Sequence, residues 1–207
     1  TETHRACVDG TFNLLLKSKA LGVRRFVYAA SSSAYGDQPI LPKVETMRPD
    51  PLSPYAVAKL TGELYCRAFH NVYGLETISL RYFNVFGPRQ NPASMYSGVI
   101  SRFIDALMTD KPAVFYGDGE QSRDFTFISN VVDANIKAAQ TSLGLGESMN
   151  VANGERTTLN GLFEVLKRIT NTPDAVADYQ PPRSGDVKHS QADNRRAIEC
   201  LNYSEIV

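Results

Sequence analysis

The chain has 207 residues, in which 22 lysines and arginines balance 22 aspartates and glutamates. This balance excludes the positive surface that attracts nucleic acids or anionic membranes, and no apolar run reaches the roughly 18 residues of a membrane helix. Cys7, Cys66 and Cys200 are odd in number and widely spaced, which is typical of free thiols in a reducing cytosol rather than of a disulfide framework or a zinc site. We therefore expect a globular, cytoplasmic protein without a bound metal.

The first part of the chain alternates between helical and strand patterns. The expected elements are an amphipathic helix over 6–21, a buried strand over 25–30, a loop with five prolines over 31–54, a helix over 54–72 and a strand over 76–81. Ser53 is a good N-cap for the second helix, Pro54 suits its first turn, and Gly74 suits its C-terminal stop.

The second part continues the alternation with shorter elements. They are a helix over 96–109, a strand over 113–116, an extended segment over 124–128, a helix over 130–140, a strand over 148–152 and a helix over 158–170. In the last helix Leu159, Leu162, Phe163, Leu166 and Ile169 have core spacing. This alternation predicts a parallel α/β sheet, and the irregular stretches after Asn84 indicate a smaller lobe interleaved with it.

Tyr55 and Lys59 lie one turn apart in the predicted helix 54–72, on one face and about 6 Å apart along its axis. An ammonium group beside a phenol favours the phenolate, so such a tyrosine can act as base and acid nearer to neutral pH. Three serines, at 31–33, follow the strand 25–30 at its carboxyl end, where α/β folds place their chemistry. Either feature alone is also typical of a solvated helix face or a turn, but together they favour a catalytic site.

Four blocks carry a family resemblance, and they follow one another in order at residues 25–37, 51–59, 80–90 and 116–125. Together they resemble the extended short-chain dehydrogenase/reductases of the nucleotide-sugar epimerase and dehydratase group, over nearly the whole chain. The resemblance implies a Rossmann-like parallel sheet with a smaller α/β substrate lobe, NAD as cofactor and a UDP-sugar as substrate. The domain bounds that it implies are 1–85 for the C-terminal part of the NAD-binding domain and 86–207 for the nucleotide-sugar lobe, with Rossmann elements interleaved near 124–152.

The resemblance implies that Tyr55 and Lys59 are catalytic and that Lys59 also bonds the nicotinamide ribose. The catalytic serine has two alignments. Counting forward from the strand selects Ser32, whereas counting back from Tyr35 selects Ser31. We expect Ser32, because a strand fixes the geometry more firmly than a loop does.

The remaining positions would contact cofactor or substrate. The cofactor residues would be Ala30, Tyr55, Lys59, Tyr82 and Val85. The substrate residues would be Ser31, Ser32, Asn84, Val99, Tyr116, Arg123, Arg183, Asp186 and Ser190. In the family, asparagine and arginines at such positions hold the diphosphate, since a guanidinium suits phosphate. Tyr82, Val99 and Tyr116 could instead be core residues. Arg123 could form an ion pair with Asp124, and Ser190 could lie in a surface loop.

The serine stretch contains neither the Thr-Asp-Glu of the family's 4,6-dehydratases nor the glutamate of its decarboxylases. The resemblance therefore implies 4-epimerisation, in which Tyr55 takes the proton of the sugar 4-hydroxyl while a transient 4-keto sugar forms. Ser190 stands where many UDP-galactose 4-epimerases carry a tyrosine. This leaves space for a 2-N-acetyl group, as in UDP-N-acetylglucosamine 4-epimerases of bacterial polysaccharide pathways, and the expected substrates are UDP-N-acetylglucosamine and UDP-N-acetylgalactosamine.

Two alternatives remain open at this point. One is a UDP-uronic acid 4-epimerase, which would need a cation for the C6 carboxylate, and the sequence identifies none. The other is a non-catalytic member that only binds nucleotide sugars. In either case the family's four-helix dimer interface corresponds to helices 6–21 and 54–72, so we expect a homodimer, with Leu60, Leu64 and Phe69 either in the interface or in the core.

The sequence contains no G-x-G-x-x-G or G-x-x-G-x-x-G loop. A dinucleotide needs such a loop, where backbone N–H groups and a helix N-terminus meet the pyrophosphate. In the family, helix 6–21 follows roughly a hundred residues of repeated βα units that would be absent here. We therefore expect an internal segment of a longer enzyme, inactive on its own.

This expectation has a direct test. The 207-residue polypeptide should retain no NAD through gel filtration and should give no saturable heat on calorimetric titration with NAD, since the pyrophosphate loop is missing. Stoichiometric NAD on a polypeptide whose intact mass matches this sequence would contradict it.

Overall fold

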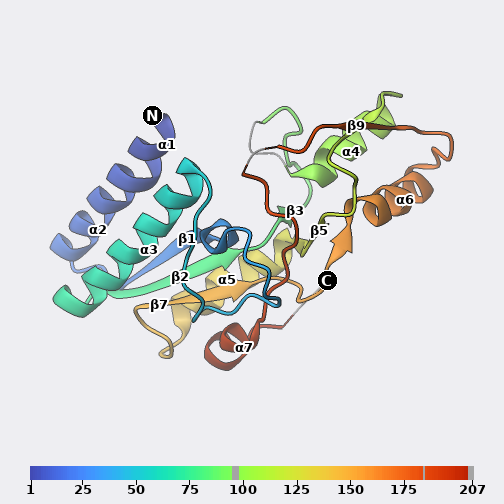
Figure 1. Ribbon diagram of the computed structural model, residues 1–207. Helices are drawn as coiled ribbons and strands as arrows, with labels where there is room; N and C mark the ends of the chain where they lie inside the picture. Colours follow the sequence, from blue (N-terminus) through green and yellow to red (C-terminus); the bar gives the residue numbers. More distant parts are fainter. Residues whose placement is uncertain (95–97, 184, 205–207) are drawn as a thin grey trace.

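The computed structural model describes residues 1–94, 98–183 and 185–204. Its helices are α1 (Glu2–His4), a π-helical turn (Arg5–Asp9), α2 (Gly10–Ala20), a 3-10 turn (Ser32–Tyr35), α3 (Pro54–Tyr73), α4 (Val99–Met108), α5 (Ile128–Gln140), α6 (Leu159–Thr170) and α7 (Arg195–Leu201). Its strands are β1 (Arg25–Ser31), β2 (Glu76–Tyr82), β3 (Val85–Phe86), β4 (Ala113–Tyr116), β5 (Ser122–Arg123), β6 (Thr126–Phe127), β7 (Glu147–Val151), β8 (Thr157–Thr158) and β9 (Ala177–Gln180). Figure 1 shows them in two groups, with the larger sheet and its helices apart from α4, α6 and β9.

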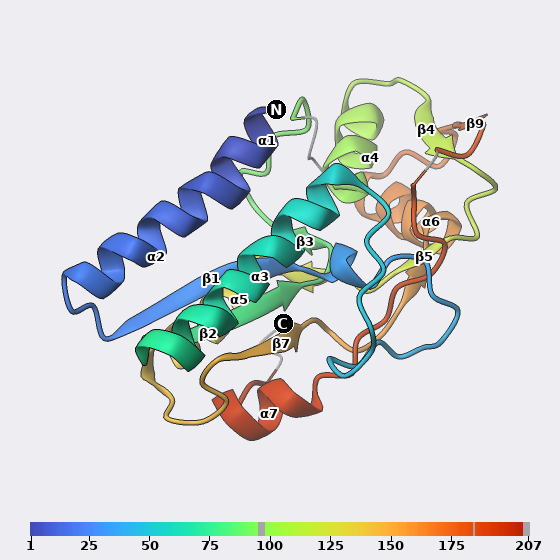
Figure 2. The ribbon, with the colours of Figure 1, turned by 60° about the vertical axis from the view of Figure 1, so that its left-hand side comes forward.

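The larger sheet is parallel, with the strand order β1-β2-β7 and β1 at one end. Ser31 pairs with Tyr82, and Tyr82 pairs with Val151, so the carboxyl ends of the strands are level with one another. Figure 2 shows α3 crossing in front of β1 and β2, with α2 beside it. The predicted parallel α/β sheet is thus confirmed, and its carboxyl edge is where polar side chains can gather.

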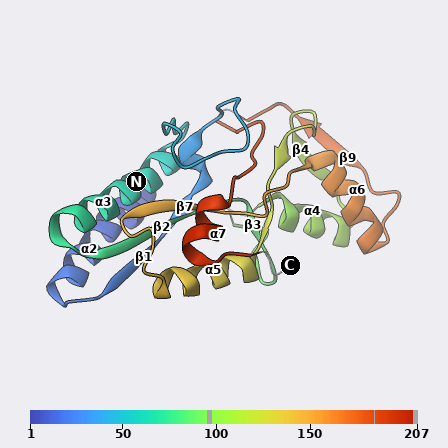
Figure 3. The same ribbon diagram turned by 90° about the horizontal axis from the view of Figure 1, so that it is seen from below.

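β2 is buried on both faces, but its two faces differ in character. Ile78 and Leu80 pack against α5, β7 and α7 in one apolar cluster. The alternate residues Thr77 and Arg81 instead bond to α3, where the Thr77 hydroxyl donates to the carbonyl of Cys66 at 2.9 Å. Because successive strand residues point to opposite faces, one strand supplies both an apolar core and a polar contact with α3. Seen from below in Figure 3, α5 and α7 lie on the side of the sheet away from α3.

The long helix α3 begins and ends as its sequence predicts. The Ser53 side chain accepts a hydrogen bond from the backbone N–H of Ala56 at 3.2 Å, and Pro54 opens the first turn. At the other end Gly74 takes the left-handed conformation with φ 71°, and its N–H bonds the carbonyl of His70. These caps fix the start of the helix, and therefore the place of Tyr55 in its first turn.

The smaller group has its own aromatic core. Phe103 of α4, Phe115 of β4 and Phe163 of α6 pack together, with ring centroids 4.6 to 5.5 Å apart. β4 pairs in parallel with β9 to form a two-stranded sheet. This core holds α4 and α6 beside the short strands that follow β2.

Some local predictions differ from the structure. Ile169 is 74% exposed at the end of α6, although its spacing predicted a core position. The predicted extended segment 124–128 ends one residue early, since Ile128 begins α5. The predicted helix 96–109 is α4 from Val99 onward, and Tyr96 lies outside the described residues. The sequence did not predict the strands β3, β5, β8 and β9, because such short strands depend on their pairing partners, and it did not predict the helix α7. Within the described ranges, no helix combines the length and apolar character needed to cross a bilayer.

Gly62 offers a test of the contact between α3 and β1. A Cβ at this position would overlap the hydroxyl and ring of Tyr28, which is buried and donates to the carbonyl of Lys59 at 3.2 Å. We expect Gly62→Ala to destabilise the protein by about 1–3 kcal/mol in urea unfolding, as overpacking does.

The matched control is Gly10→Ala in α2, whose new Cβ would meet its nearest neighbour at an ordinary 3.4 Å. That variant should be neutral or gain up to about 1 kcal/mol from helix propensity. Equal stability of the two variants would contradict this picture of the α3–β1 contact.

Candidate active site

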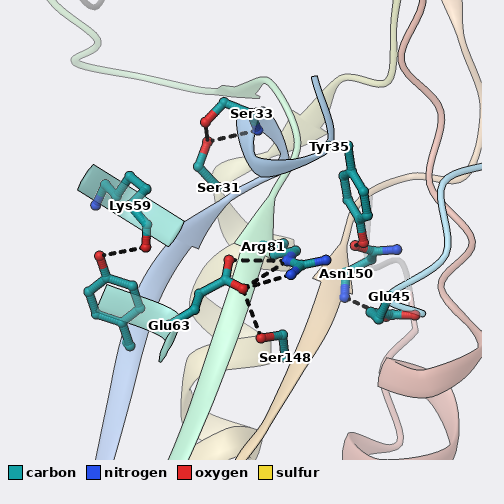
Figure 4. A network of polar contacts seen from close by, with 10 residues as sticks. Ser31, Ser33, Tyr35, Glu45, Lys59, Glu63, Arg81, Ser148 and Asn150 are labelled. Atoms are coloured by element: carbon teal, nitrogen blue, oxygen red, sulfur yellow. Dashed lines mark hydrogen bonds and ion pairs between the residues drawn. The ribbon is translucent and has the colours of Figure 1, made fainter. Parts of the chain in front are cut away.

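The serine run forms a short cap at the end of β1. Ser31 is the last strand residue, and its hydroxyl oxygen accepts hydrogen bonds from the Ser33 N–H at 3.2 Å and the Ser33 hydroxyl at 2.9 Å (Figure 4). Ser32 begins the 3-10 turn that follows. Ser31 is therefore held at the strand end by its neighbour, whereas Ser32 belongs to the turn.

Tyr55 and Lys59 project from the start of α3 toward the same region. The Lys59 ammonium donates to the carbonyl of Ala29 in β1 at 2.9 Å and lies 5.5 Å from the ring centroid of Tyr28. Lys59 is thus fixed against β1, one turn from Tyr55 as predicted.

A cavity of about 480 Å³ opens where these strand ends meet α3. It brings together most of the residues that the sequence predicted for cofactor and sugar. Those on its wall are Ala30, Ser31, Ser32, Tyr55, Tyr82, Asn84, Val85, Arg123, Asp186 and Ser190. Lys59 lies beside this wall, against Ala29.

Two further cavities continue from the first one. One of about 560 Å³ and another of about 420 Å³ both include Tyr116, Arg183, Arg123 and Asp186, and the second also includes Val99. Arg123 and Asp186 line all three cavities, so they form the junction between the strand ends and the smaller lobe. The predicted site residues therefore line one hollow made of three adjoining cavities that share Arg123 and Asp186, with Lys59 at its side.

Arg123 is held at this junction by backbone carbonyls. One guanidinium nitrogen donates to Ser122 O at 3.0 Å and to Lys188 O at 3.1 Å. Burial lowers the pKa of Arg123, while the nearby carboxylates of Asp186 and Asp37 raise it. A partly desolvated guanidinium next to an open cavity is suited to bind an anion.

The neighbouring Asp124 has a structural task of its own. Its carboxylate accepts hydrogen bonds from the N–H groups of Asn153, Gly154 and Ala192, at 2.9 to 3.1 Å. Asp124 thereby joins the loop after β7 to the segment that carries Ser190.

Asn84 and Ser190 form a bonded pair on the cavity wall. Asn84 follows β2 with φ 27°, a left-handed region that asparagine adopts more readily than most residues. Its amide nitrogen donates to the hydroxyl of Ser190 and to the carbonyl of Asp124, both at 3.2 Å. Ser190 is only 8% exposed, so it is a wall residue and not a surface-loop serine.

At the far end of the hollow, Arg183 stacks on Tyr116. The guanidinium carbon lies 3.5 Å from the ring centroid, a cation–π contact. Ser184, the next residue of the predicted Arg-x-Gly-Asp turn, lies outside the described residues. Tyr116 and Arg183 therefore stand at the part of the hollow that is remote from Tyr55.

A buried ion pair joins α3 to β2 (Figure 4). Glu63, two turns after Tyr55, binds Arg81 of β2 through contacts of 2.7 to 3.1 Å and accepts the Ser148 hydroxyl at 3.0 Å. Glu63 and Arg81 have side chains only 4% and 5% exposed. The pair fixes α3 along the sheet.

Arg81 also reaches the serine turn. Its guanidinium lies 4.7 Å from the ring centroid of Tyr35, whose hydroxyl donates to Asn150 at 2.7 Å. Burial raises the pKa of Tyr35 to about 12, which keeps the phenol neutral and able to donate. The Arg81 guanidinium thus contacts both Glu63 of α3, the helix that carries Tyr55, and Tyr35 of the 3-10 turn that follows Ser31.

Sequence reasoning missed several residues of this site. Lys43 and Gln90 line the cavity of about 480 Å³ that also contains Tyr55. Glu63 and Arg81 form the ion pair that joins α3 to β2 next to it. Gln90 ends the block 80–90, and its place in that block could have identified it as a site residue. No sequence pattern identifies Lys43, because a lysine in a proline-rich loop is expected to be exposed.

The site can now be compared with known proteins. The sequence pattern of the NAD dependent epimerase/dehydratase family matches residues 1–152. The chain is 36% identical over 197 residues to the UDP-glucose 4-epimerase of Mycolicibacterium smegmatis, covering 95% of the chain and 62% of that relative. It is 37% identical over 198 residues to the UDP-glucuronate 4-epimerase of Thermodesulfobacterium geofontis, covering 95% and 59% respectively.

A solved structure shows the same likeness. The UDP-N-acetylglucosamine 4-epimerase of Methanobrevibacter ruminantium, in complex with UDP-N-acetylmuramic acid, matches with a TM-score of 0.92 and 38% identity. That match covers 97% of this chain and 64% of the other. The fold is therefore the Rossmann-like fold of nucleotide-sugar epimerases.

The chain belongs to the NAD dependent epimerase/dehydratase family. The chain spans 62% of the length of the Mycolicibacterium smegmatis relative and 59% of the length of the Thermodesulfobacterium geofontis relative.

The buried ion pair behind the site yields a prediction. Glu63→Gln should destabilise the protein by about 3–5 kcal/mol in urea unfolding, because it leaves Arg81 buried without its countercharge. The control is Glu164→Gln, which removes a pair with Lys167 in which Glu164 is 66% exposed. That variant should change stability by less than about 1 kcal/mol. Similar effects of both substitutions would show that the buried pair does not hold α3.

Proposed function

We propose that this chain carries the proton-transfer centre and the nucleotide-sugar site of an NAD-dependent UDP-sugar 4-epimerase. One observation carries the proposal: Tyr55 and the serines at 31–33 line the same hollow that continues past Arg123 to Tyr116. A general base and hydroxyl groups at one end, with cations and an aromatic ring at the other, fit a sugar joined by diphosphate to a nucleoside. In such an enzyme residues 1–85 would belong to the NAD-binding domain and most of 86–207 to the sugar-nucleotide lobe.

In this proposal Tyr55 takes the proton of the sugar 4-hydroxyl and later returns it. A serine at the strand end holds the same oxygen by a hydrogen bond. Ser32 remains the predicted residue, and Ser31 lies beside it with its oxygen bonded by Ser33. Lys59, one turn along from Tyr55, places a positive charge near the phenol and so favours its ionised form.

The residues around Tyr55 fit the nicotinamide end of NAD. Ala30, Tyr82 and Val85 provide largely apolar walls, while Lys59 provides a donor for a ribose hydroxyl. Bound NAD supplies the hydride acceptor and donor that oxidation and re-reduction at C4 require. The sequence has no glycine-rich loop for the pyrophosphate, so these residues account for one end of the cofactor.

The other end of the hollow suits the UDP group. Asn84, Arg123 and Arg183 would contact the diphosphate, Asp186 the ribose hydroxyls, and Val99 and Tyr116 the uracil. For the sugar we propose N-acetylglucosamine and its 4-epimer, in bacterial polysaccharide synthesis in the cytoplasm. The support is that Ser190 is a small, buried residue on the sugar wall. A solved relative named as a UDP-N-acetylglucosamine 4-epimerase supports the same choice.

We also propose that two copies pair through α2 and α3. Leu14 and Leu16 of α2 are 59% and 40% exposed, and Val57 and Leu64 of α3 are 49% and 57% exposed. Phe69 packs in the core with Leu15 and Cys66. The exposed leucines and Val57 therefore provide an apolar surface for a second copy.

The function can be tested on the full-length protein that contains this chain. Incubated with NAD and UDP-N-acetylglucosamine, it should form UDP-N-acetylgalactosamine, separable by chromatography. Tyr55→Phe should lower kcat by about 10²–10⁴-fold, as loss of a general base does, with affinity for the UDP-sugar within about twofold.

The matched control is Tyr73→Phe, at the far end of the same helix and 49% exposed, which should keep full activity. Near wild-type turnover of the Tyr55→Phe enzyme would contradict the proposal. Tight binding of UDP-sugars without any turnover would favour a non-catalytic family member.

A further inference from the structure

Tyr35 is a buried tyrosine at the end of the 3-10 turn Ser32–Tyr35, here called the serine turn. Tyr35 is 1% exposed, whereas Ser32, at the start of the turn, is half-buried and lines the cavity that contains Tyr55. In a 3-10 helix the side chains of residues three apart lie one above the other, so Ser32 and Tyr35 share one face of the turn. The position of the tyrosine side chain therefore constrains the direction of the serine hydroxyl.

The hydroxyl of Tyr35 bonds the serine turn to the larger sheet. It donates to the side-chain oxygen of Asn150 in β7 at 2.7 Å (Figure 4). Asn150 is fully buried, and its amide nitrogen donates to Lys43 O at 2.9 Å and to Asp193 O at 3.1 Å. Because a flipped amide would lose both of these bonds, the amide oxygen is directed at the tyrosine. The end of the serine turn is thus held at a fixed place on β7.

The remaining hydrogen bonds at the end of the turn are of a different kind. The carbonyl of Ala34 accepts the N–H of Asp50 at 3.0 Å, and the carbonyl of Tyr35 accepts the Gln38 amide at 2.7 Å. Both donors belong to the proline-rich loop that follows the turn. These bonds hold the turn to the loop, whereas the Tyr35 hydroxyl holds it to the sheet.

The ring of Tyr35 fills the space between the serine turn and β2. Its centroid lies 4.7 Å from the guanidinium carbon of Arg81 and 6.1 Å from the ring centroid of Phe83. These contacts need the ring alone, so they persist when the hydroxyl is removed. Burial raises the pKa of Tyr35 to about 12, so its phenol is a hydrogen-bond donor and not a second base. The hydroxyl can therefore be tested separately from the packing of the ring.

We propose that Tyr35 is a positioning residue, whose bond to Asn150 directs the Ser32 hydroxyl to the sugar oxygen that Tyr55 deprotonates. This inference rests on the proposed function, because it needs Ser32 as the group that holds that oxygen. It deepens the function by naming the residue that orients the serine. Tyr35 acts through Ser32 and does not itself touch the sugar.

The test measures turnover of the full-length protein that contains this chain, with NAD and UDP-N-acetylglucosamine, or with UDP-glucose if that sugar reacts faster. Tyr35→Phe should lower kcat about tenfold and leave KM within about twofold, because a misplaced group costs rate more than ground-state binding. Ser32→Ala should lower kcat about 10²-fold, as loss of a donor to a reacting oxygen does. In the Ser32→Ala enzyme, Tyr35→Phe should cost no further activity, because the group that it orients is gone.

Tyr203→Phe separates positioning from a general loss of stability. Tyr203 is 3% exposed, belongs to the apolar cluster of α5 and α7, and donates its hydroxyl to Ala152 O at 2.8 Å. Removing this hydroxyl deletes a comparable buried hydrogen bond, as urea unfolding of both variants can verify, yet kcat should stay within about twofold. A purely structural role of Tyr35 predicts equal effects of the two substitutions on kcat.

A second variant removes the same bond from the side of the strand. Asn150→Ala deletes the acceptor of the Tyr35 hydroxyl, so it should also lower kcat and should also cost nothing further in the Ser32→Ala enzyme. Far-UV circular dichroism checks that each variant is folded. The inference thus stays testable if one of the two variants does not fold.

The outcomes separate the inference from the proposed function. Wild-type kcat in Tyr35→Phe, a loss no larger than that of Tyr203→Phe, or independent losses from Tyr35→Phe and Ser32→Ala overturn the role of Tyr35 and leave the epimerase proposal standing. If the wild type epimerises neither UDP-N-acetylglucosamine nor UDP-glucose, the proposed function fails, and the inference fails with it.

Discussion

The structure depends on one buried ion pair, between Glu63 of α3 and Arg81 of β2. A helix packed on a sheet by apolar contacts alone can slide by part of a turn at little cost. A bidentate pair between side chains that are almost fully buried removes this freedom, since a shift would leave two charges desolvated and unpaired. Because Tyr55 lies two turns before Glu63, the same pair sets the tyrosine level with the carboxyl ends of the strands.

The other half of the site is set by hydrogen bonds between segments far apart in the sequence. Asp124 binds the backbone of Asn153, Gly154 and Ala192, and Asn84 binds Ser190. These contacts draw the last part of the chain back over the strand ends, where it closes one side of the cavity. The candidate site thus lies between the strand ends with the start of α3 on one side and a returning segment that forms the other side of the cavity.

How far the sequence predicted this structure depends on the range of the interactions involved. The bounds of α3, and with them the spacing of Tyr55 and Lys59, follow from local caps at Ser53 and Gly74. The prediction that Ile169 is a core residue was wrong. Its spacing from the other apolar residues fits one face of α6, but this end of the helix projects beyond the core. Lys43 and Arg81 were not predicted at all. Their burial depends on partners in other elements, such as Glu63 for Arg81 and Gln191 for Lys43, which no local pattern encodes.

β1 stands at the end of the strand order, paired with β2 alone within the described sheet. A parallel strand with an apolar run such as Phe26 and Val27 is normally covered on both faces. One of its carbonyls, that of Ala29, accepts the ammonium of Lys59 instead of a strand N–H. The lysine one turn from Tyr55 therefore also satisfies a backbone acceptor of β1, so removing its ammonium would leave a strand carbonyl without its partner.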